Sequence, residues 1–334
     1  MPFSLYERFV KQGTLSEPEG IPDPQYALPS TINWIRSLSM VVKSHSTNYQ
    51  EASRFYSNVE KRTADVRVEN SIFEHLLLGI HQASALRALK NAEVQSDVTR
   101  VASVAWYYGI YAAATAMIAA QDGTLQDNHT QTANSWDRQF AQRGLVMLPF
   151  DFRVSTCLEK EGNEEIDSFR RGPKTNLVAP PDSLDMAHDY NCSYLSGTRK
   201  WYAWRFCEEL RKSKDFKQLG VSDFRTKAAR DLRDQRLSGM CVSFMHQAIR
   251  FRGKANYREA LYLAHGNSVE TQVQNFVSDL SCVLEAFLSM AGAFSFKILW
   301  LKLEESKAFE RTIGVFRIFV GYRGKTNSPQ PIQH

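Results

Sequence analysis

The chain has 334 residues, of which 43% are hydrophobic and 23% are charged, fractions that are typical of globular proteins and exclude bulk disorder. Its net charge of +5 is mild and is compatible with an anionic partner without requiring one. With only 17 glycines and 11 prolines, the composition favours long helices over a turn-rich all-β fold.

The sequence gives little indication of a membrane-spanning segment, of disulfide bonds or of a cysteine metal site. The N-terminus, Met1 to Val10, lacks the apolar core of a signal peptide, and the longest apolar run, Cys282 to Leu301, contains Glu285 and Lys297. Charges in a lipid-spanning helix are costly, so we expect a buried helix there and no membrane contact. Five dispersed cysteines without a CxxC pair favour reduced thiols in a cytoplasmic protein over disulfides or a zinc site. They are Cys157, Cys192, Cys207, Cys241 and Cys282.

The N-terminal half is predicted to be helical after an extended lead-in. Prolines and glycines crowd the lead-in, residues 1–30. A first helical half follows over 31–150, where apolar spacing predicts helices at 30–42, 51–66 and 71–89. Ser30 and Thr31 are expected to cap the first of these helices.

The clearest helix is predicted over Asp97 to Gln121. Ser96 can cap it, Asp97 suits the positive end of the helix, and Gly123 can end it. Its middle, residues 105–114, is apolar on almost every side, which places this helix at the centre of a bundle.

Three tyrosines in this helix have two interpretations. Tyr107, Tyr108 and Tyr111 are expected to pack in the core with satisfied hydroxyl groups. The alternative is a platform on which nucleic-acid bases stack.

The C-terminal half is predicted to begin after a break. Three prolines and an acidic run make 159–196 a loop-rich insertion or domain boundary. A second helical half is expected over 197–322, with helices at 198–212, 222–251, 257–264 and 269–303. β-Branched and aromatic residues at 312–322 predict a short C-terminal strand, and 324–334 a frayed tail. The fold class expected is therefore all-α.

A basic segment raises the prospect of nucleic-acid binding. Nine cations and two acids between Arg225 and Arg258 give a local net charge of +7, which would concentrate a phosphate backbone. The alternative is a solvated helix face on which Asp231 and Asp234 pair with nearby arginines. The residues expected to bind nucleic acid are Arg225, Arg230, Arg233, Arg236, Arg250 and Lys254.

The end of this segment suggests proton-transfer chemistry. Arg258 and His265 are seven positions apart, so on a helix they would share a face about 10 Å apart along the axis. Histidine could relay a proton while arginine stabilises charge on a phosphoryl group, without a metal or other cofactor. Two copies facing each other across a dimer would complete such a site. The alternative is that His265 only ends a helix before Gly266.

Two patches of the sequence resemble HEPN domains. Ala105 to Ala120, followed by Gly123 and Asn128-His129-Thr130, is similar to their Tyr/Ala-rich helix and the histidine that opens the next helix. Residues 252–257, Arg-Gly-Lys-Ala-Asn-Tyr, are similar to the Arg-x-x-Ala-x-Tyr signature near the end of such domains.

The resemblance implies an all-α bundle that forms a homodimer. Many HEPN proteins are metal-independent ribonucleases of toxin–antitoxin or phage-defence systems, in which histidine follows arginine by four to six residues. Carried over to this chain, the catalytic candidates are Arg252 with Tyr257, where tyrosine replaces the histidine, or Arg258 with His265.

Two other functions remain open. Tyr257 at the histidine position is compatible with a non-catalytic partner or sensor subunit of a multi-component bacterial system, encoded near its partner. The same arginines could instead bind a small phosphate ligand in a nucleotide-binding regulatory domain. The sequence contains no GxxxxGK[ST], GxSxG or HExxH motif, and His75 and His81 lack a third partner for a metal.

Overall fold

The computed structural model describes residues 12–13, 24–175, 177, 179–257 and 273–299. These residues form helices and no strand, which confirms the all-α fold class. The elements in chain order are α2 (Pro24–Ser44), α3 (Tyr49–Phe55), α4 (Val66–Leu89), α5 (Gln95–Asp122), α6 (His129–Trp136), the π-helix η1 (Asp137–Ala141), α7 (Glu159–Ser168), α8 (Leu184–Lys212), α9 (Lys214–Gln218), α10 (Lys227–Ser238), α11 (Phe244–Tyr257) and α13 (Phe276–Leu299).

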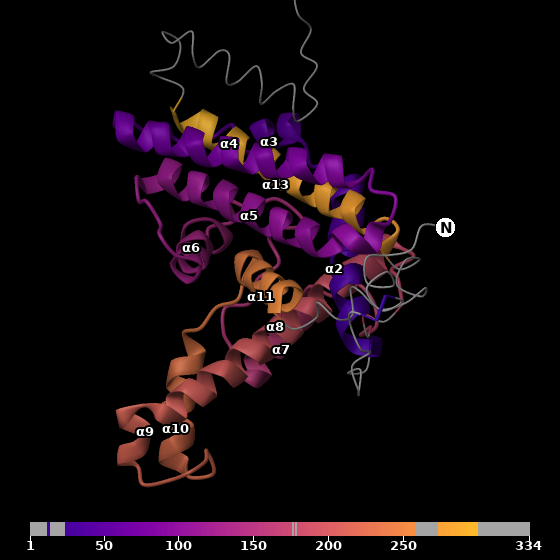
Figure 1. Ribbon diagram of the computed structural model, residues 1–334. Coiled ribbons are helices and arrows are strands. Elements are labelled where there is room, and N and C mark those ends of the chain that lie inside the picture. The colour runs from indigo at the N-terminus through magenta and orange to yellow at the C-terminus, as the bar shows by residue number, and fades with distance from the viewer. Residues whose placement is uncertain (1–11, 14–23, 176, 178, 258–272, 300–334) are drawn as a thin grey trace, which may run out of the picture.

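Three long helices, α4, α5 and α13, run beside one another and form the main body (Figure 1). Glycines let them approach closely. A Cβ atom on Gly79 of α4 would lie 2.6 Å from a δ-methyl group of Leu288, and one on Gly109 of α5 would lie 2.7 Å from both δ-methyl groups of Leu284. The interior faces of α4 and α5 therefore have no room for larger side chains where α13 packs on them.

The two most apolar helices are core helices. Gln95–Asp122 and Phe276–Ile298 are long and apolar enough to cross a membrane, but 78% and 83% of their most apolar windows are buried within the protein. The expectation that the Cys282 run forms a buried helix is confirmed as far as Ile298. Glu285 lies at the edge of this core, where Arg87 Nε donates a 2.8 Å ion-paired hydrogen bond to it.

Aromatic rings join this body to the remaining helices. Trp106 of α5 is fully buried and contacts Trp34 of α2 and Phe251 of α11, with ring centroids 6.0 and 5.0 Å away. Trp34 in turn stacks on Tyr194 of α8 at 4.0 Å. These contacts fix α2, α8 and α11 against α5, so α11 has a defined position relative to the tyrosines of α5.

Smaller cores lie along α8. One includes Val154, Ile166, Cys192 and Val242, and another, at the far end of α8, includes Phe216 of α9. Figure 1 shows α9 and α10 at this end, well away from α4 and α13. The protein thus has a main bundle and an arm that carries α10.

The boundaries of the N-terminal helices differ from the predicted ones. α2 begins at Pro24, not at Ser30, because proline is favoured in the first turn of a helix, where its missing N–H is not needed. The helix expected over 51–66 is only α3, and Asp65 caps α4 by accepting a hydrogen bond from the Val68 N–H. α5 matches its prediction closely, although Val94, not Ser96, occupies its N-cap position.

The segment 159–196 is not loop-rich throughout, which corrects the predicted insertion. α7 occupies 159–168 and α8 starts at Leu184, so only 169–183 lacks a helix. Ser183 caps α8 by accepting a hydrogen bond from the Met186 N–H, which places the helix start just after the two prolines.

The helix expected over 222–251 is divided into α10 and α11, because Val242 pairs in an extended bridge with Val154. The predicted strand at 312–322 and the tail lie outside the described residues.

Replacing Gly109 by valine is expected to lower the free energy of unfolding by about 2 kcal/mol, because the new side chain would overpack the Leu284 contact. The matched control is Gly253→Val in α11, where no atom lies within 4 Å of the position that a Cβ atom would take, and we expect a change below about 0.5 kcal/mol. Denaturant unfolding followed by circular dichroism measures both. Equal losses in the two variants would contradict the close approach of α5 and α13.

Candidate functional site

The predicted basic strip is divided between two places. On α10 and the loop before it, aspartates neutralise the arginines: Arg225 pairs with Asp223 at 3.2 Å, and Arg233 with Asp234 at 2.7 Å. Two further contacts complete the set, Arg236 with Asp215 at 3.6 Å and Arg230 with the Arg225 carbonyl group at 2.6 Å. Ion pairs thus reduce the free charge of Arg225, Arg233 and Arg236, but they are not the pairs of Asp231 and Asp234 with arginines three or four residues away that the alternative interpretation expected.

The α11 cations point to different neighbours. Arg250 Nη1 donates to Thr198 Oγ1 at 3.1 Å and its guanidinium lies over the Tyr194 ring, whereas Lys254 donates to Ser30 Oγ at 3.5 Å. Tyr257 is the last residue of α11, and its side chain is not among those described. Arg258 and His265 lie outside the described residues, so their predicted pairing stays a prediction.

Arg252 is the one predicted catalytic candidate whose side-chain contacts are described, and it meets His129. Its Nη1 lies 2.8 Å from His129 Nε2, although the two residues are 123 positions apart. His129 Nδ1 lies 2.8 Å from the hydroxyl group of Tyr107. The Arg252 guanidinium lies over two rings, 5.1 Å from the Tyr107 centroid and 5.9 Å from that of Tyr108. We call Arg252, His129, Tyr107, Tyr108 and Tyr111 the histidine–arginine cluster.

Local structure presents each member of the cluster. His129 is the first residue of α6, whose N-cap, Asn128, accepts a hydrogen bond from the Gln131 N–H. α5 ends at Gly123, which has a φ of +82° and donates its N–H to Ala119, as its sequence predicts. The turn after Gly123 brings His129 back along α5, where its ring lies 4.4 Å from the Tyr111 centroid.

The contacts fix the protonation state of His129. An arginine can only donate, so Nε2 must carry a lone pair and Nδ1 the proton, which it donates to the Tyr107 oxygen. Burial and, to a smaller extent, the charge of Arg252 lower the pKa of His129 below its usual value. The imidazole is therefore neutral near pH 7, and its Nε2 can accept a proton. Burial also raises the pKa of Tyr107, so that the phenol stays protonated.

Arg252 has no carboxylate partner among the described residues. It is half-buried and rests on aromatic faces, so water only partly screens it. Tyr108 is 37% exposed beside it, and His129 is half-buried. A phosphate oxygen could bind Arg252 here while a flat base lies on Tyr108.

His129 was not predicted as a site residue from the sequence. Its only signal there was its place at the start of a helix in the resemblance to HEPN domains. Tyr107 is buried, as the core interpretation expected, but Tyr108 is exposed and Tyr111 half-buried. Only the folded chain shows that Arg252 is the partner of His129.

A second histidine, His246, is structural. It is fully enclosed, and its Nδ1 accepts a 3.2 Å hydrogen bond from the Ser243 N–H while Nε2–H donates to Asn134 Oδ1 at 3.0 Å. Burial lowers its pKa to about 4. With both ring nitrogens satisfied inside the protein, this histidine has no free position for a substrate.

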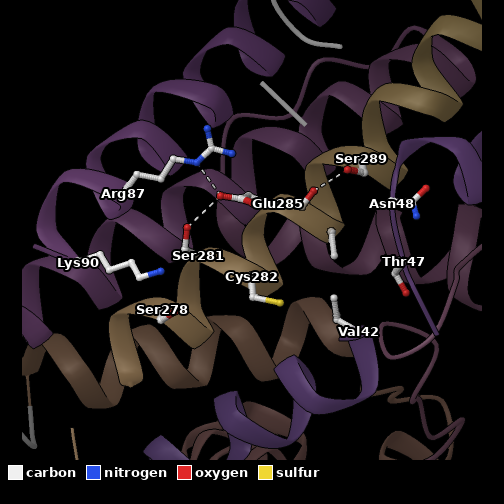
Figure 2. Close-up of a pocket in the computed structure, with 11 residues that line it drawn as sticks. Val42, Thr47, Asn48, Arg87, Lys90, Ser278, Ser281, Cys282, Glu285 and Ser289 are labelled. Atoms are coloured by element: carbon white, nitrogen blue, oxygen red, sulfur yellow. Dashed lines mark hydrogen bonds and ion pairs between the residues drawn. The ribbon is translucent and has the colours of Figure 1, made fainter. Parts of the chain in front are cut away.

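A pocket of about 510 Å³, lined by α13, the end of α4, α2 and the segment before α3, is a weaker candidate (Figure 2). Its carboxylate, Glu285, already accepts hydrogen bonds from Arg87 at 2.8 Å and Ser281 at 3.0 Å, and Ser289 donates to the Glu285 carbonyl group. The polar groups at the centre of this pocket therefore already form hydrogen bonds with one another. Within the described part of the chain, no group of three His, Cys, Asp or Glu side chains is placed to hold a metal ion.

Comparisons with known proteins do not identify a family for this chain. The chain matches no protein-family model, no curated protein and no solved structure. The histidine–arginine cluster therefore has to be interpreted from its own chemistry.

The Arg252→Met variant is expected to raise the pKa of His129, because it removes a nearby positive charge that disfavours the imidazolium. Arg250→Met is the matched control, since Arg250 contacts Thr198 and Tyr194 instead, and it should leave that pKa unchanged. An NMR titration of the ring nitrogens measures both. A His129 pKa that is the same in the wild type and both variants would contradict the contact.

Proposed function

We propose that the protein binds RNA at the histidine–arginine cluster and cleaves it without a metal ion. The observation that supports this best is the 2.8 Å contact between Arg252 and a neutral His129, beside the exposed Tyr108. The cluster combines an uncompensated cation, a proton acceptor and an aromatic face, which match the phosphate, the hydroxyl group and the base of a ribonucleotide.

Binding would begin with the exchange of partners at Arg252. A phosphate oxygen is a stronger acceptor for the guanidinium than a neutral imidazole, because the hydrogen bond then joins opposite charges. The phosphate would therefore displace His129 Nε2 from Arg252. This displacement frees the lone pair of Nε2 next to the bound phosphate.

The cleavage step then follows from general acid–base chemistry. His129 Nε2 takes the proton of the 2′-hydroxyl group, and the 2′-oxygen attacks the adjacent phosphorus. The bond from phosphorus to the 5′-oxygen breaks, a 2′,3′-cyclic phosphate forms, and the departing oxygen takes a proton from water. The resulting hydroxide takes the proton from His129, which returns the imidazole to its neutral form. Arg252 stabilises the negative charge on the non-bridging oxygens. Tyr107 holds the ring through Nδ1, so that Nε2 keeps its position.

The resemblance to HEPN domains adds to this proposal, because His129 and Arg252 come from the two patches that carry it. A homodimer, a role in a toxin–antitoxin or phage-defence system and a cytoplasmic location belong to the same proposal. The competing function is that of a non-catalytic partner or sensor subunit, in which the cluster would bind without cleaving.

Single-stranded RNA labelled with a fluorophore should bind the wild type with an affinity that falls as salt rises, and Arg252→Met should weaken binding about tenfold. Arg225→Met is the matched control, because Arg225 is 91% exposed and paired with Asp223, so its loss should cost less than about twofold. Fluorescence anisotropy measures all three proteins.

Cleavage is followed on the same RNA in EDTA. His129→Phe should retain binding and lower the cleavage rate by at least about 100-fold, since it keeps the ring and removes the base. Binding with no cleavage by the wild type would favour the non-catalytic function. Absence of salt-sensitive binding, or equal effects of Arg252→Met and Arg225→Met, would refute the proposal.

A further inference from the structure

A separate pocket of about 260 Å³ lies where α7, α8 and α10 meet. It is built from helices other than α5, α6 and α11, which form the histidine–arginine cluster. The residues that matter to its chemistry are Leu158 and Glu159 at the start of α7, Arg199, Lys200 and Trp204 of α8, and Arg233 of α10.

Arg199, in the wall of this pocket, is a buried cation without a carboxylate partner among the described residues. It is 1% exposed. Its Nη1 donates to the carbonyl groups of Cys157 and Leu158 at 3.1 and 2.9 Å, and its Nη2 to Asn163 Oδ1 at 2.9 Å. Its Nε–H has no acceptor among the described residues. Neutral oxygens thus surround a full charge, and Nε itself is enclosed beside Gly162, so burying this charge is costly unless an anion lies close by.

The start of α7 contributes further donors. This helix has ten residues, and its N-cap position, Leu158, provides no side-chain acceptor. The backbone N–H groups of residues 159–161 donate no hydrogen bond within the described part of the chain. Helix N-termini carry partial positive charge and bind phosphate oxygens through such free N–H groups.

A glycine holds α7 against Arg199. A Cβ atom on Gly162 would lie 2.7 Å from Arg199 Cδ and 2.9 Å from the Thr156 carbonyl oxygen. The absence of a side chain here lets the first turn of α7 and the buried guanidinium lie at one place. The backbone N–H groups at the start of α7 and the Arg199 side chain are therefore close together.

The charges around the pocket leave a cationic excess. Arg199, Lys200 and Arg233 face Glu159 and Asp234, a net charge of +1, and Asp234 is already paired with Arg233 at 2.7 Å. Trp204 is 57% exposed in the same wall and offers a flat apolar surface.

We infer that this pocket binds the phosphate group of a small phosphomonoester. Side-chain and backbone donors from two helices suit the several oxygens of a phosphate better than the two of a carboxylate. The organic part of the ligand would lie against Trp204. The inference does not depend on RNA binding at Arg252.

Inorganic phosphate and glycerol phosphate serve as probes, with acetate at equal ionic strength as the carboxylate control. Both phosphates should raise the melting temperature of the wild-type protein saturably and change its tryptophan fluorescence, whereas acetate should do neither. Trp204→Phe should lose the fluorescence change and keep the rise in melting temperature.

Lys200→Gln should weaken phosphate binding about tenfold, because it removes a charge at the pocket. Lys212→Gln, an exposed position later in α8 that does not line the pocket, is the matched control and should bind as the wild type does. Lys200→Gln should leave RNA binding unchanged, which separates this inference from the proposed function. An unsaturable phosphate response, equal binding by the two lysine variants, or acetate binding as tight as that of phosphate would overturn it.

Discussion

The close packing of α4, α5 and α13 against one another is the constraint on which the rest of the structure depends. Gly79 and Gly109 allow this packing, since any larger side chain would meet Leu288 or Leu284. Contacts with two long helices hold α5 in one orientation, so its tyrosines have fixed positions. The side of α5 near α6 and α11 is where Tyr108 reaches solvent, and the histidine–arginine cluster lies there.

Charge alone does not locate the site. The arginines of α10 are more numerous, but Arg233 and Arg236 are paired with aspartates at the surface, where ion pairs are screened by water. Arg252 is a single cation, yet it lies on aromatic rings beside a neutral imidazole and has no carboxylate among its described contacts. Its charge therefore stays available to an anion. Arg199 also has no carboxylate partner among its described contacts, and carbonyl groups accept its hydrogen bonds instead.

Local signals predicted much of the fold. The burial of α5 and its end at Gly123 follow from composition and from the backbone freedom of glycine. The division between α10 and α11 could not be predicted in this way, because it depends on a bridge to Val154, far away in the sequence. The site could be predicted only in part, because it also depends on contacts between residues far apart in the sequence. Arg252 was a candidate, but its partner His129 belongs to another helix, and only tertiary packing joins them.

Photocrosslinking of RNA that contains 4-thiouridine, followed by mass spectrometry of tryptic peptides, tests the central claim most directly. The peptide 101–138 contains Tyr108, Tyr111 and His129 and no internal lysine or arginine. We predict that this peptide carries the main crosslink and that excess unlabelled RNA removes it. Crosslinks confined to peptides of α10, with none on 101–138, would contradict it.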